Sequence, residues 1–402
     1  MLTINDALNR ILEAAKKINA KRKVVIDNLP LEDSLGLTLA EDQISQIDVP
    51  PADNSAMDGY AINCDALSNS ASTRFIISQT IAAGSAPQTL AMGTAARILT
   101  GAEIPQGANA VVMQEQCEIT EDAVIVPAGI AAHNNVRTRG QDIQVGDRIL
   151  QQGHVLRPQD IGLLASIGIA NVSVLRPLTV AILSTGDELV EPGQPLVAGK
   201  IYNSNRYLLK GFLKKLNMNV LDLGLVEDNL DATKACLAKA AALADCIIST
   251  GGVSVGDEDH VKRAVAELGV LDVWRIALKP GKPLAFGAID NTPFFGLPGN
   301  PVSTFVTFLL FVKPFLCLQQ GQINNTPTAT LLIANFSSKA NPKRQEYVRV
   351  RRNMDKLDML SNQSSGVLSS VVQADGLAVI PIGQAISPGD TVEYICFDEF
   401  YR

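Results

Sequence analysis

The feature that most constrains this chain is a regular alternation of apolar runs and helical patterns between about residues 177 and 320. The runs are short, rich in Val, Ile and Leu, and bounded by polar or glycine turns, which is typical of buried strands. Strands are expected at 178–183, 219–223, 246–248 and 274–277, and helices are expected to begin near Asn205, Asp231, Glu258 and Pro301. This alternation indicates a mostly parallel sheet covered by helices on both faces, with ligands at the carboxyl ends of its strands.

Two glycine loops directly follow strands of this predicted sheet: STGGVSVGDEDH at 249–260 and STGDE at 184–188. Glycine lets backbone N–H groups approach an anion closely, and the helix N-terminus after the first loop adds partial positive charge. Since both loops leave the same edge of the sheet, we expect them to face a shared crevice that binds phosphate. The candidate anion-binding residues are Ser184, Thr185, Gly186, Ser249, Thr250, Gly251, Gly252, Ser254 and Gly256.

Carboxylates beside these loops fit an anion site if a divalent cation bridges them to the anion, as Mg²⁺ commonly does. The carboxylates considered in the two loops are those of Asp187, Glu188, Asp257 and Asp259. Asp228, which follows the strand pattern of 219–226, is expected at the same edge. The competing interpretation is simpler, because acidic residues often occupy the first turn of a helix or a solvated turn without binding anything.

A stiff cationic loop, KPGKP at 279–283, follows the next strand. The ammonium groups of Lys279 and Lys282 repel each other unless an anion neutralises them, so the loop favours binding of phosphate or another oxyanion. The turn GLPGNPVS at 296–303 is a further anion candidate through Pro298, Gly299, Asn300 and Pro301. The alternatives are two exposed surface lysines, and an Asn300 that only caps the helix beginning at Pro301.

The rest of the chain has a different texture. Short β-like runs separated by Gly, Pro and Asn turns fill about 45–140 and 328–402, which predicts an inserted β module and a C-terminal β-barrel. An amphipathic helix is expected at 3–20, packing with residues 141–176 as one unit. The predicted domains are 1–44 with 141–176, then 45–140, 177–326 and 327–402.

Composition argues against several classes of function. The 34 Lys and Arg residues against 41 Asp and Glu give a net charge of −7 without a basic block, so nucleic acid is not an expected partner. The six cysteines form no C-x-x-C pair and the N-terminus does not resemble a signal peptide, which together predict reduced thiols and a cytoplasmic protein. The longest apolar stretch, 305–312, is interrupted by Lys313-Pro314 and is too short to cross a bilayer, so no membrane is expected.

Three polar segments lie in and around the inserted module: PPADNSAMDGYA at 50–61, RILTGA at 97–102 and VRTRGQD at 136–142. Segments this polar are rarely core. Arg137 and Arg139 alternate with shorter residues, so a strand would present both on one face, where they could bind an anion or simply face solvent. The first segment could equally be a turn that enters the module.

Seven segments together resemble those of molybdopterin molybdenumtransferases of the MoeA type, a family that includes the E domain of gephyrin. They occur in family order at 50–61, 97–115, 136–143, 182–193, 249–260, 278–287 and 296–303. The chain departs from the common family pattern at Ala52, Gln141 and His260. None of these departures removes a carboxylate, lysine or glycine of the predicted anion and metal sites.

The resemblance implies an elongated homodimer with four domains in each subunit: a dimerising domain, an inserted β domain, a three-layer αβα molybdopterin-binding domain and a C-terminal β-barrel. The cleft would be shared, with the β domain of one subunit facing the α/β and barrel domains of the other. The implied activity is insertion of molybdate into adenylylated molybdopterin, with Mg²⁺ and with release of AMP.

Carried onto this sequence, the resemblance implies catalytic roles for Asp58, Thr100, Asp142, Glu188, Asp228 and Asp259. A metal would be held by Glu188, Asp228 or Asp259, whereas Asp58, Thr100 and Asp142 would reach across the dimer. Substrate would be bound by Arg137, the two glycine loops, the two lysines and the turn at 298–301.

Two other functions stay open. A non-catalytic scaffold of the same fold would be marked by loss of the acidic and lysine loops, and here they are intact. A molybdopterin adenylyltransferase, which is also an expected partner of this chain, shares the α/β domain but is a single small domain. This chain is much longer than one such domain, and it contains the segment at 50–61. Both features argue against an adenylyltransferase.

Overall fold

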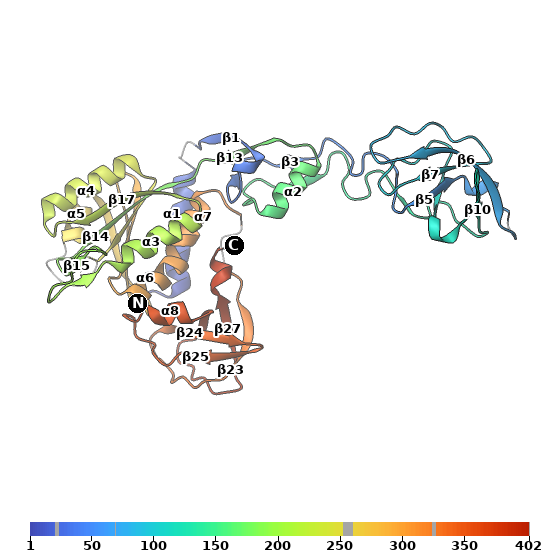
Figure 1. Ribbon diagram of the computed structural model, residues 1–402. Coiled ribbons are helices and arrows are strands. Elements are labelled where there is room, and N and C mark those ends of the chain that lie inside the picture. Colours follow the sequence, from blue (N-terminus) through green and yellow to red (C-terminus); the bar gives the residue numbers. More distant parts are fainter. Residues whose placement is uncertain (21–23, 69, 252–259, 324–326, 402) are drawn as a thin grey trace.

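The computed structural model describes residues 1–402 apart from 21–23, 69, 252–259, 324–326 and 402. The molecule is elongated: a β module at one end is joined by a slender middle segment to an α/β domain and a barrel at the other (Figure 1). The chain passes through the middle segment twice, where β3 (Gln43–Ile44) pairs with β12 (Arg148–Leu150). The predicted multidomain architecture of α/β and β parts is confirmed.

The α/β domain holds a six-stranded sheet with the order β17-β14-β18-β22-β21-β19. Its first four strands are parallel, and β21 and β19 complete it as an antiparallel edge, so the mostly parallel sheet is confirmed. The strand expected at 274–277 instead ends at Arg275 and runs antiparallel to its neighbour. The strands are β14 (Thr179–Thr185), β17 (Asn219–Val226), β18 (Cys246–Thr250), β19 (Gly269–Arg275), β21 (Pro283–Ile289) and β22 (Thr292–Leu297).

Helices cover both faces of this sheet, which confirms the predicted three layers. One face carries α4 (Leu230–Leu243) and α5 (His260–Leu268), and the other carries α3 (Ser204–Lys215) and α6 (Pro301–Thr307). On the second face the rings of Phe212 and Phe308 stack with 4.5 Å between their centroids. Burial on both faces explains why β14 and β18 are almost wholly apolar until their last residues. The helix start expected near Glu258 lies outside the described residues.

The N-terminal helix, α1 (Ile4–Asn19), also packs on the second face. Thr3 caps its first turn, and the Gln319 amide donates a hydrogen bond to the Ala15 carbonyl at 2.8 Å. The expectation that this helix packs with residues 141–176 is wrong, because its apolar side joins the cluster around α7 (Lys313–Gln319). Helical periodicity shows that a face is buried but not what buries it. The buried residues are Ile4, Ala7, Ile11 and Ala15.

One buried helical run threads the α/β domain: α6, a π-helical turn η4 (Phe308–Val312) and α7 follow one another directly. The helical run therefore continues through Lys313-Pro314, where the apolar stretch is interrupted in the sequence. Pro314 lacks the N–H that would bond to the preceding turn, and the change of hydrogen-bond pattern falls just before it. Lys313 remains inside the core at 1% exposure, and burial lowers the pKa of its ammonium group.

Among the described residues, Pro301–Gln319 is the one helix whose length and composition would allow it to cross a membrane. Its most apolar window is 89% buried inside the fold. That burial is typical of the core helix of a globular domain.

The middle segment consists of short strands and one helix. β1 (Ile26–Pro30), β13 (Asn171–Leu175) and β2 (Thr38–Leu39) form an antiparallel sheet. α2 (Pro158–Ser166) packs beside it and shares a separate apolar cluster with both crossings of the chain. The proposed domain boundaries are not tested by this packing and stay a prediction.

Asp160 holds the start of α2. Its side chain is 4% exposed, and its carboxylate accepts hydrogen bonds from the Arg157 N–H at 2.8 Å and from the Arg157 guanidinium at 2.9 and 3.0 Å. His154 Nε2 lies 2.8 Å from the same carboxylate. Burial alone would raise the pKa of Asp160, but the bonds from Arg157 and His154 outweigh it and hold the pKa well below its usual range.

Replacing Asp160 by asparagine should destabilise α2 by about 1–3 kcal/mol at neutral pH, because an amide cannot replace a carboxylate in these bonds. A carboxyl group whose pKa is lowered by folding stabilises the protein above its unfolded pKa, near 4, and loses that contribution as the pH falls. The difference between parent and variant should therefore shrink below about pH 4, as measured by hydrogen exchange in residues 158–166. Equal destabilisation at neutral and acidic pH would contradict this role.

The inserted β module contains a six-stranded sheet with the order β8-β5-β7-β6-β10-β9, and it confirms the β texture predicted for 45–140. Apolar clusters lie on the two faces of the sheet, so the module has a core of its own. Its strands are β4 (Asn54–Ser55), β5 (Gly59–Ile62), β6 (Thr73–Ile81), β7 (Thr94–Ile98), β8 (Ala110–Met113), β9 (Glu118–Ile119), β10 (Ala123–Val126) and β11 (Val136–Arg137).

The C-terminal strands close a five-stranded barrel, as predicted: β24 pairs with β25 and β26, β23 with β25 and β27, and β26 with β27. The barrel is held to the α/β domain at two places. β20 (Leu278–Lys279) pairs in parallel with β24, and the terminal turn η5 (Phe397–Tyr401) returns so that the Phe397 ring lies 5.1 Å from that of Phe305. The remaining elements are β23 (Thr330–Ala334), β24 (Gln345–Asn353), β25 (Lys356–Met359), α8 (Ser369–Gln373), β26 (Gly376–Ile380) and β27 (Thr391–Cys396).

Candidate functional site

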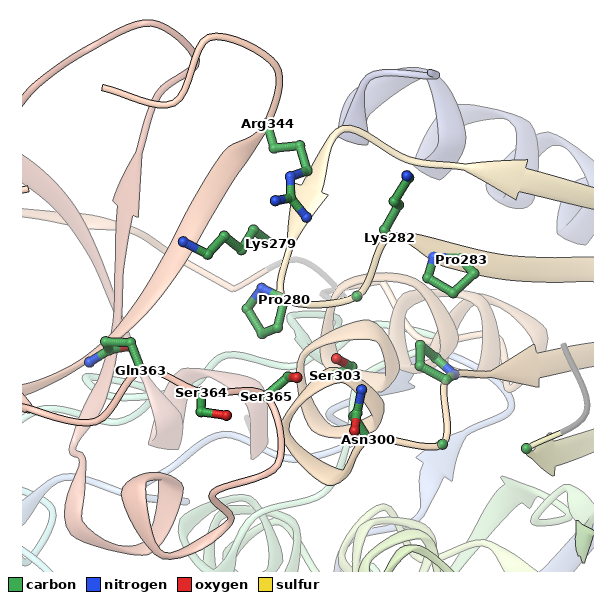
Figure 2. A pocket seen from close by; sticks show the side chains of 14 residues that line it. Lys279, Pro280, Lys282, Pro283, Asn300, Ser303, Arg344, Gln363, Ser364 and Ser365 are labelled. Atoms are coloured by element: carbon green, nitrogen blue, oxygen red, sulfur yellow. The ribbon is translucent and has the colours of Figure 1, made fainter. Parts of the chain in front are cut away.

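A cavity of about 670 Å³ lies between the carboxyl edge of the α/β sheet and the barrel (Figure 2). The α/β domain supplies the loop after β20 and the turn between β22 and α6, and the barrel supplies residues before β24 and before α8. Six residues predicted from the sequence therefore meet in one cavity: Gly251, Lys279, Lys282, Pro298, Gly299 and Asn300. The other lining residues are Pro280, Gly281, Pro283, Ser303, Arg344, Gln363, Ser364 and Ser365.

Three cationic side chains stand on one side of the cavity: Lys279, Lys282 and Arg344 (Figure 2). The ammonium group of Lys279 lies 3.1 Å from both carboxylate oxygens of Glu346. The predicted repulsion between two unpaired lysines is thus partly relieved within the chain. Among the described residues no ion pair involves Lys282, which is exposed, so its ammonium group is available to a bound anion.

Two glycines allow the backbone to pack closely at this site. Gly281, between the two lysines, has φ +111°, and a Cβ there would lie 2.6 Å from Thr307 Cγ2. Gly251 has φ +86°, and its Cβ would lie 2.6 Å from the Thr185 carbonyl oxygen. Any side chain at either position would combine an unfavourable backbone conformation with a steric clash.

The turn between β22 and α6 is fixed from three directions. Asn205 Nδ2 donates to the Gly299 carbonyl at 2.7 Å, Thr304 Oγ1 donates to the Pro298 carbonyl at 2.5 Å, and the Val302 N–H donates to Ser365 at 3.0 Å. Asn300 occupies the N-cap position of α6, which begins at Pro301, but its side chain makes no capping hydrogen bond and lines the cavity instead. The structure therefore favours a ligand-facing Asn300 over one that only caps the helix.

The barrel's share of the cavity was missed in the sequence. Gln363 and the two serines that follow it line the cavity and belong to a polar run at 362–366. This run interrupts a region of strand-like sequence, and that interruption could have indicated a binding surface. Behind the run, Arg349 is 1% exposed, and burial lowers the pKa of its guanidinium to about 10. It donates to Ser370 Oγ at 3.2 Å and to the Ser364 carbonyl at 3.1 Å, so it fixes this wall from inside.

The described hydroxyl residues of the two glycine loops are buried and do not line the cavity. Ser184 is opposite Thr250 on the neighbouring parallel strands β14 and β18, and their hydroxyl oxygens are 3.2 Å apart. With Thr185 and Ser249 they are buried, whereas Gly186 is half-buried. The strand ends that lead into the two loops lie side by side, and of the described loop residues Gly251 is the one that lines the cavity. The crevice shared by both loops stays a prediction.

The predicted metal ligands are only partly described. Glu188 and Asp228 follow the neighbouring strands β14 and β17, and both are exposed. Glu188 precedes β15 (Leu189–Val190), which pairs with β16 (Ile201–Tyr202). Within the described ranges no group of three or more His, Cys, Asp or Glu residues could hold a metal. The predictions for Gly252, Ser254, Gly256 and Asp259 lie outside the described residues.

Four further predicted residues, Asp58, Thr100, Arg137 and Asp142, are exposed and do not line the cavity. Pro301, half-buried as the first residue of α6, does not line it either. Asp58 and Thr100 are brought together, because the Asp58 carboxylate accepts hydrogen bonds from the Thr100 N–H at 2.7 Å and from its hydroxyl at 2.9 Å. These bonds lower the pKa of Asp58. Arg137 pairs with Asn54 across β11 and β4, and the Asp142 N–H donates to the Val49 carbonyl at 3.0 Å.

Three family profiles match the chain in order. The MoeA N-terminal region (domain I and II) matches residues 2–168, the probable molybdopterin binding domain matches 181–317, and the MoeA C-terminal region (domain IV) matches 332–397. The fold and the profiles therefore define a multidomain protein of the MoeA type.

Whole-length relatives place the chain more closely. The molybdopterin molybdenumtransferase of Haemophilus influenzae is 39% identical over 98% of each chain, and that of a Nostoc species is 34% identical over 98% of this chain and 93% of its own. The solved structure of the molybdopterin biosynthesis MoeA protein from Pyrococcus horikoshii covers 99% of this chain and 100% of its own, with a TM-score of 0.85 at 28% identity. The chain belongs to the molybdopterin molybdenumtransferase family. The predicted family, its role in molybdenum cofactor biosynthesis and its assignment as an enzyme are confirmed.

Proposed function

We propose that this enzyme inserts molybdate into adenylylated molybdopterin and releases AMP in a Mg²⁺-dependent reaction. The observation that carries the proposal is the cavity in which Lys279, Lys282 and Arg344 converge beside glycine-rich turns. Phosphates and tetrahedral oxyanions are bound by this combination of positive charge and closely approachable backbone. Relatives that match nearly the whole chain are named molybdopterin molybdenumtransferase, which supports the same substrates.

Both proposed substrates are anions, so the site must offset their mutual repulsion. Two unit charges about 4 Å apart repel by about 4 kcal/mol at an effective dielectric constant near 20. Lys282 and Arg344 would each offset part of this repulsion. Lys279 would offset a further part when the ligand shares its ammonium group with Glu346. In this proposal these residues bind molybdate and hold it beside the adenylylated substrate.

The residues present suit Mg²⁺. This ion is commonly held by one or two carboxylates together with substrate phosphates, and the exposed Glu188 and Asp228 at adjacent strand ends provide such a pair, with Asp259 as a third candidate. When bound, Mg²⁺ polarises a phosphoanhydride for cleavage. The chain's own part is to supply these carboxylates at the edge of the sheet that also forms the cavity.

The active unit we propose is a homodimer. The module that carries Asp58 and Thr100 lies at the far end of the molecule from the barrel and the α/β domain (Figure 1). Residues of the module could therefore complete the cavity of a second copy but not that of their own chain. We also propose the predicted domain boundaries, except that α1 belongs to the α/β domain on which it packs. We further propose a cytoplasmic location, and a molybdopterin adenylyltransferase as the partner that supplies the substrate.

The test is incubation of the purified chain with adenylylated molybdopterin and molybdate, with and without Mg²⁺. AMP should appear only when molybdate and Mg²⁺ are both present, and molybdenum should be retained on the pterin, as measured by chromatography and elemental analysis. AMP release without transfer of molybdenum would contradict the proposal.

A parallel incubation with molybdopterin and ATP separates the alternatives. An adenylyltransferase would consume ATP, whereas the proposed enzyme should not. A non-catalytic scaffold would yield no AMP in either reaction, although the intact lysine loop and acidic residues already argue against it.

A further inference from the structure

One carboxylate stands behind the cationic side of the cavity. Glu346, on β24, has a side chain that is only 11% exposed, and both of its oxygens lie 3.1 Å from Lys279 Nζ. The Asn341 amide donates a further hydrogen bond to it at 2.6 Å. A carboxylate this close to the proposed oxyanion site opposes ligand binding, because like charges repel.

The Lys279–Glu346 pair spans the two domains that form the cavity. The two residues are register partners where β20 pairs in parallel with β24. The Gln345 N–H donates to the Ala277 carbonyl at 2.9 Å beside them. The backbone thus places the carboxylate next to the ammonium group whether or not a ligand is present.

Asn341 extends the same network to a second cation. Its Oδ1 accepts hydrogen bonds from the N–H groups of Lys343 and Arg344, each at 3.1 Å, while its Nδ2 is bonded to Glu346. Glu346 therefore positions Lys279 directly, and it supports the turn that carries Arg344 through Asn341.

The ammonium group of Lys279 can be shared. The side chain of Lys279 is 46% exposed, whereas that of Glu346 is 11% exposed. Water therefore competes with Glu346 for the ammonium group of Lys279. Ion pairs this exposed typically strengthen an interaction only about two- to five-fold. A doubly charged oxyanion entering the cavity can compete for the same ammonium group.

We propose that Glu346 is a positioning residue and an internal counter-ion: it holds the Lys279 ammonium group at the cavity in the ligand-free protein and competes with the bound oxyanion for it. This inference rests on the proposed function, since it requires that molybdate binds in this cavity. The consequence is that Glu346 keeps Lys279 in place while limiting how tightly the oxyanion is held.

Glu346→Gln tests the proposal, because it keeps the shape of the side chain and an acceptor for Asn341 but removes the charge. Molybdate binding to the full chain, measured by calorimetry, should tighten about two- to five-fold. Perrhenate, a tetrahedral monoanion, should gain less, since the repulsion removed scales with ligand charge. Glu267→Gln is the matched control: it breaks the Lys234–Glu267 ion pair between α4 and α5 and should leave both affinities unchanged.

The gain should also depend on Lys279. In a Lys279→Met background, Glu346→Gln should tighten molybdate binding less than it does in the parent chain. If Glu346 only stabilises the contact between the barrel and the α/β domain, Glu346→Gln would lower thermal stability without changing the affinity for molybdate. That result would overturn the proposal.

Unchanged or weaker molybdate binding in folded Glu346→Gln would overturn it as well. If that variant does not fold, Glu346→Asp keeps the charge but withdraws it from Lys279, so it should also tighten binding; unchanged binding there would count against the proposal. Failure of the proposed function looks different, because the parent chain and Lys282→Ala would then bind molybdate equally.

Discussion

Replacing Lys282 by alanine should weaken molybdate binding about ten-fold and lower kcat/KM by at least as much. Its ammonium group lines the cavity, is exposed and makes no ion pair within the described part of the chain. A hydrogen bond to a charged group contributes about 1.5–3 kcal/mol, and a ten-fold change in affinity is about 1.4 kcal/mol. Replacing Lys279 should cost less, since Glu346 already occupies part of its charge.

Lys239→Ala is the control for this experiment. Lys239 is an exposed lysine of α4, on the face of the sheet opposite α6, so its loss changes net charge equally without touching the cavity. Its affinity for molybdate should match that of the parent chain. If Lys282→Ala also binds molybdate like the parent, the oxyanion site lies elsewhere.

The α/β half of the cavity could be predicted because its signals are local. A strand followed by glycine and hydroxyl residues places them at the carboxyl edge of the sheet, and β14 and β18 do lie side by side there. The spacing of Lys279 and Lys282 likewise places both in one short loop. The rule does not distinguish residues that line a cavity from those that are buried, so it also selects Ser184 and Thr250, which are buried and do not line the cavity.

The barrel half could not be predicted because it depends on contacts between distant parts of the sequence. Arg344 and Ser365 reach the cavity only after β20 has paired with β24 and the Val302 N–H has bonded Ser365. No periodicity encodes such a pairing. The burial of Lys313 could not be predicted for a related reason. A charged residue followed by proline normally ends an apolar run. Lys313 is enclosed only by helices and a terminal turn that come from other parts of the sequence.

The packing of α1 shows the same limit. Its amphipathic pattern correctly predicts a helix with one buried side, but the pattern is equally compatible with the middle segment and with α7. Which of them buries it is decided by three-dimensional arrangement, here by the Gln319 bond to Ala15 and the apolar cluster around them.

A site shared between two subunits is the idea on which the proposed mechanism depends. Asp58 is held by Thr100 on a module far from the cavity of its own chain, whereas Lys282 lines that cavity (Figure 1). The two residues can therefore act in one reaction only if a second copy brings them together. Removing either should lower the transfer of molybdenum at least about ten-fold.

The most direct test mixes the two defects. Asp58→Ala and Lys282→Ala chains, each at least about ten-fold less active alone, are co-expressed so that mixed dimers form, and AMP release is measured. About half of the dimers that form at random are mixed, and in a shared site each mixed dimer has both residues intact in one of its two cavities. The activity of the mixture should therefore recover to roughly a quarter of that of the parent. Activity no higher than the average of the two separate variants would show that Asp58 and Lys282 do not meet across subunits.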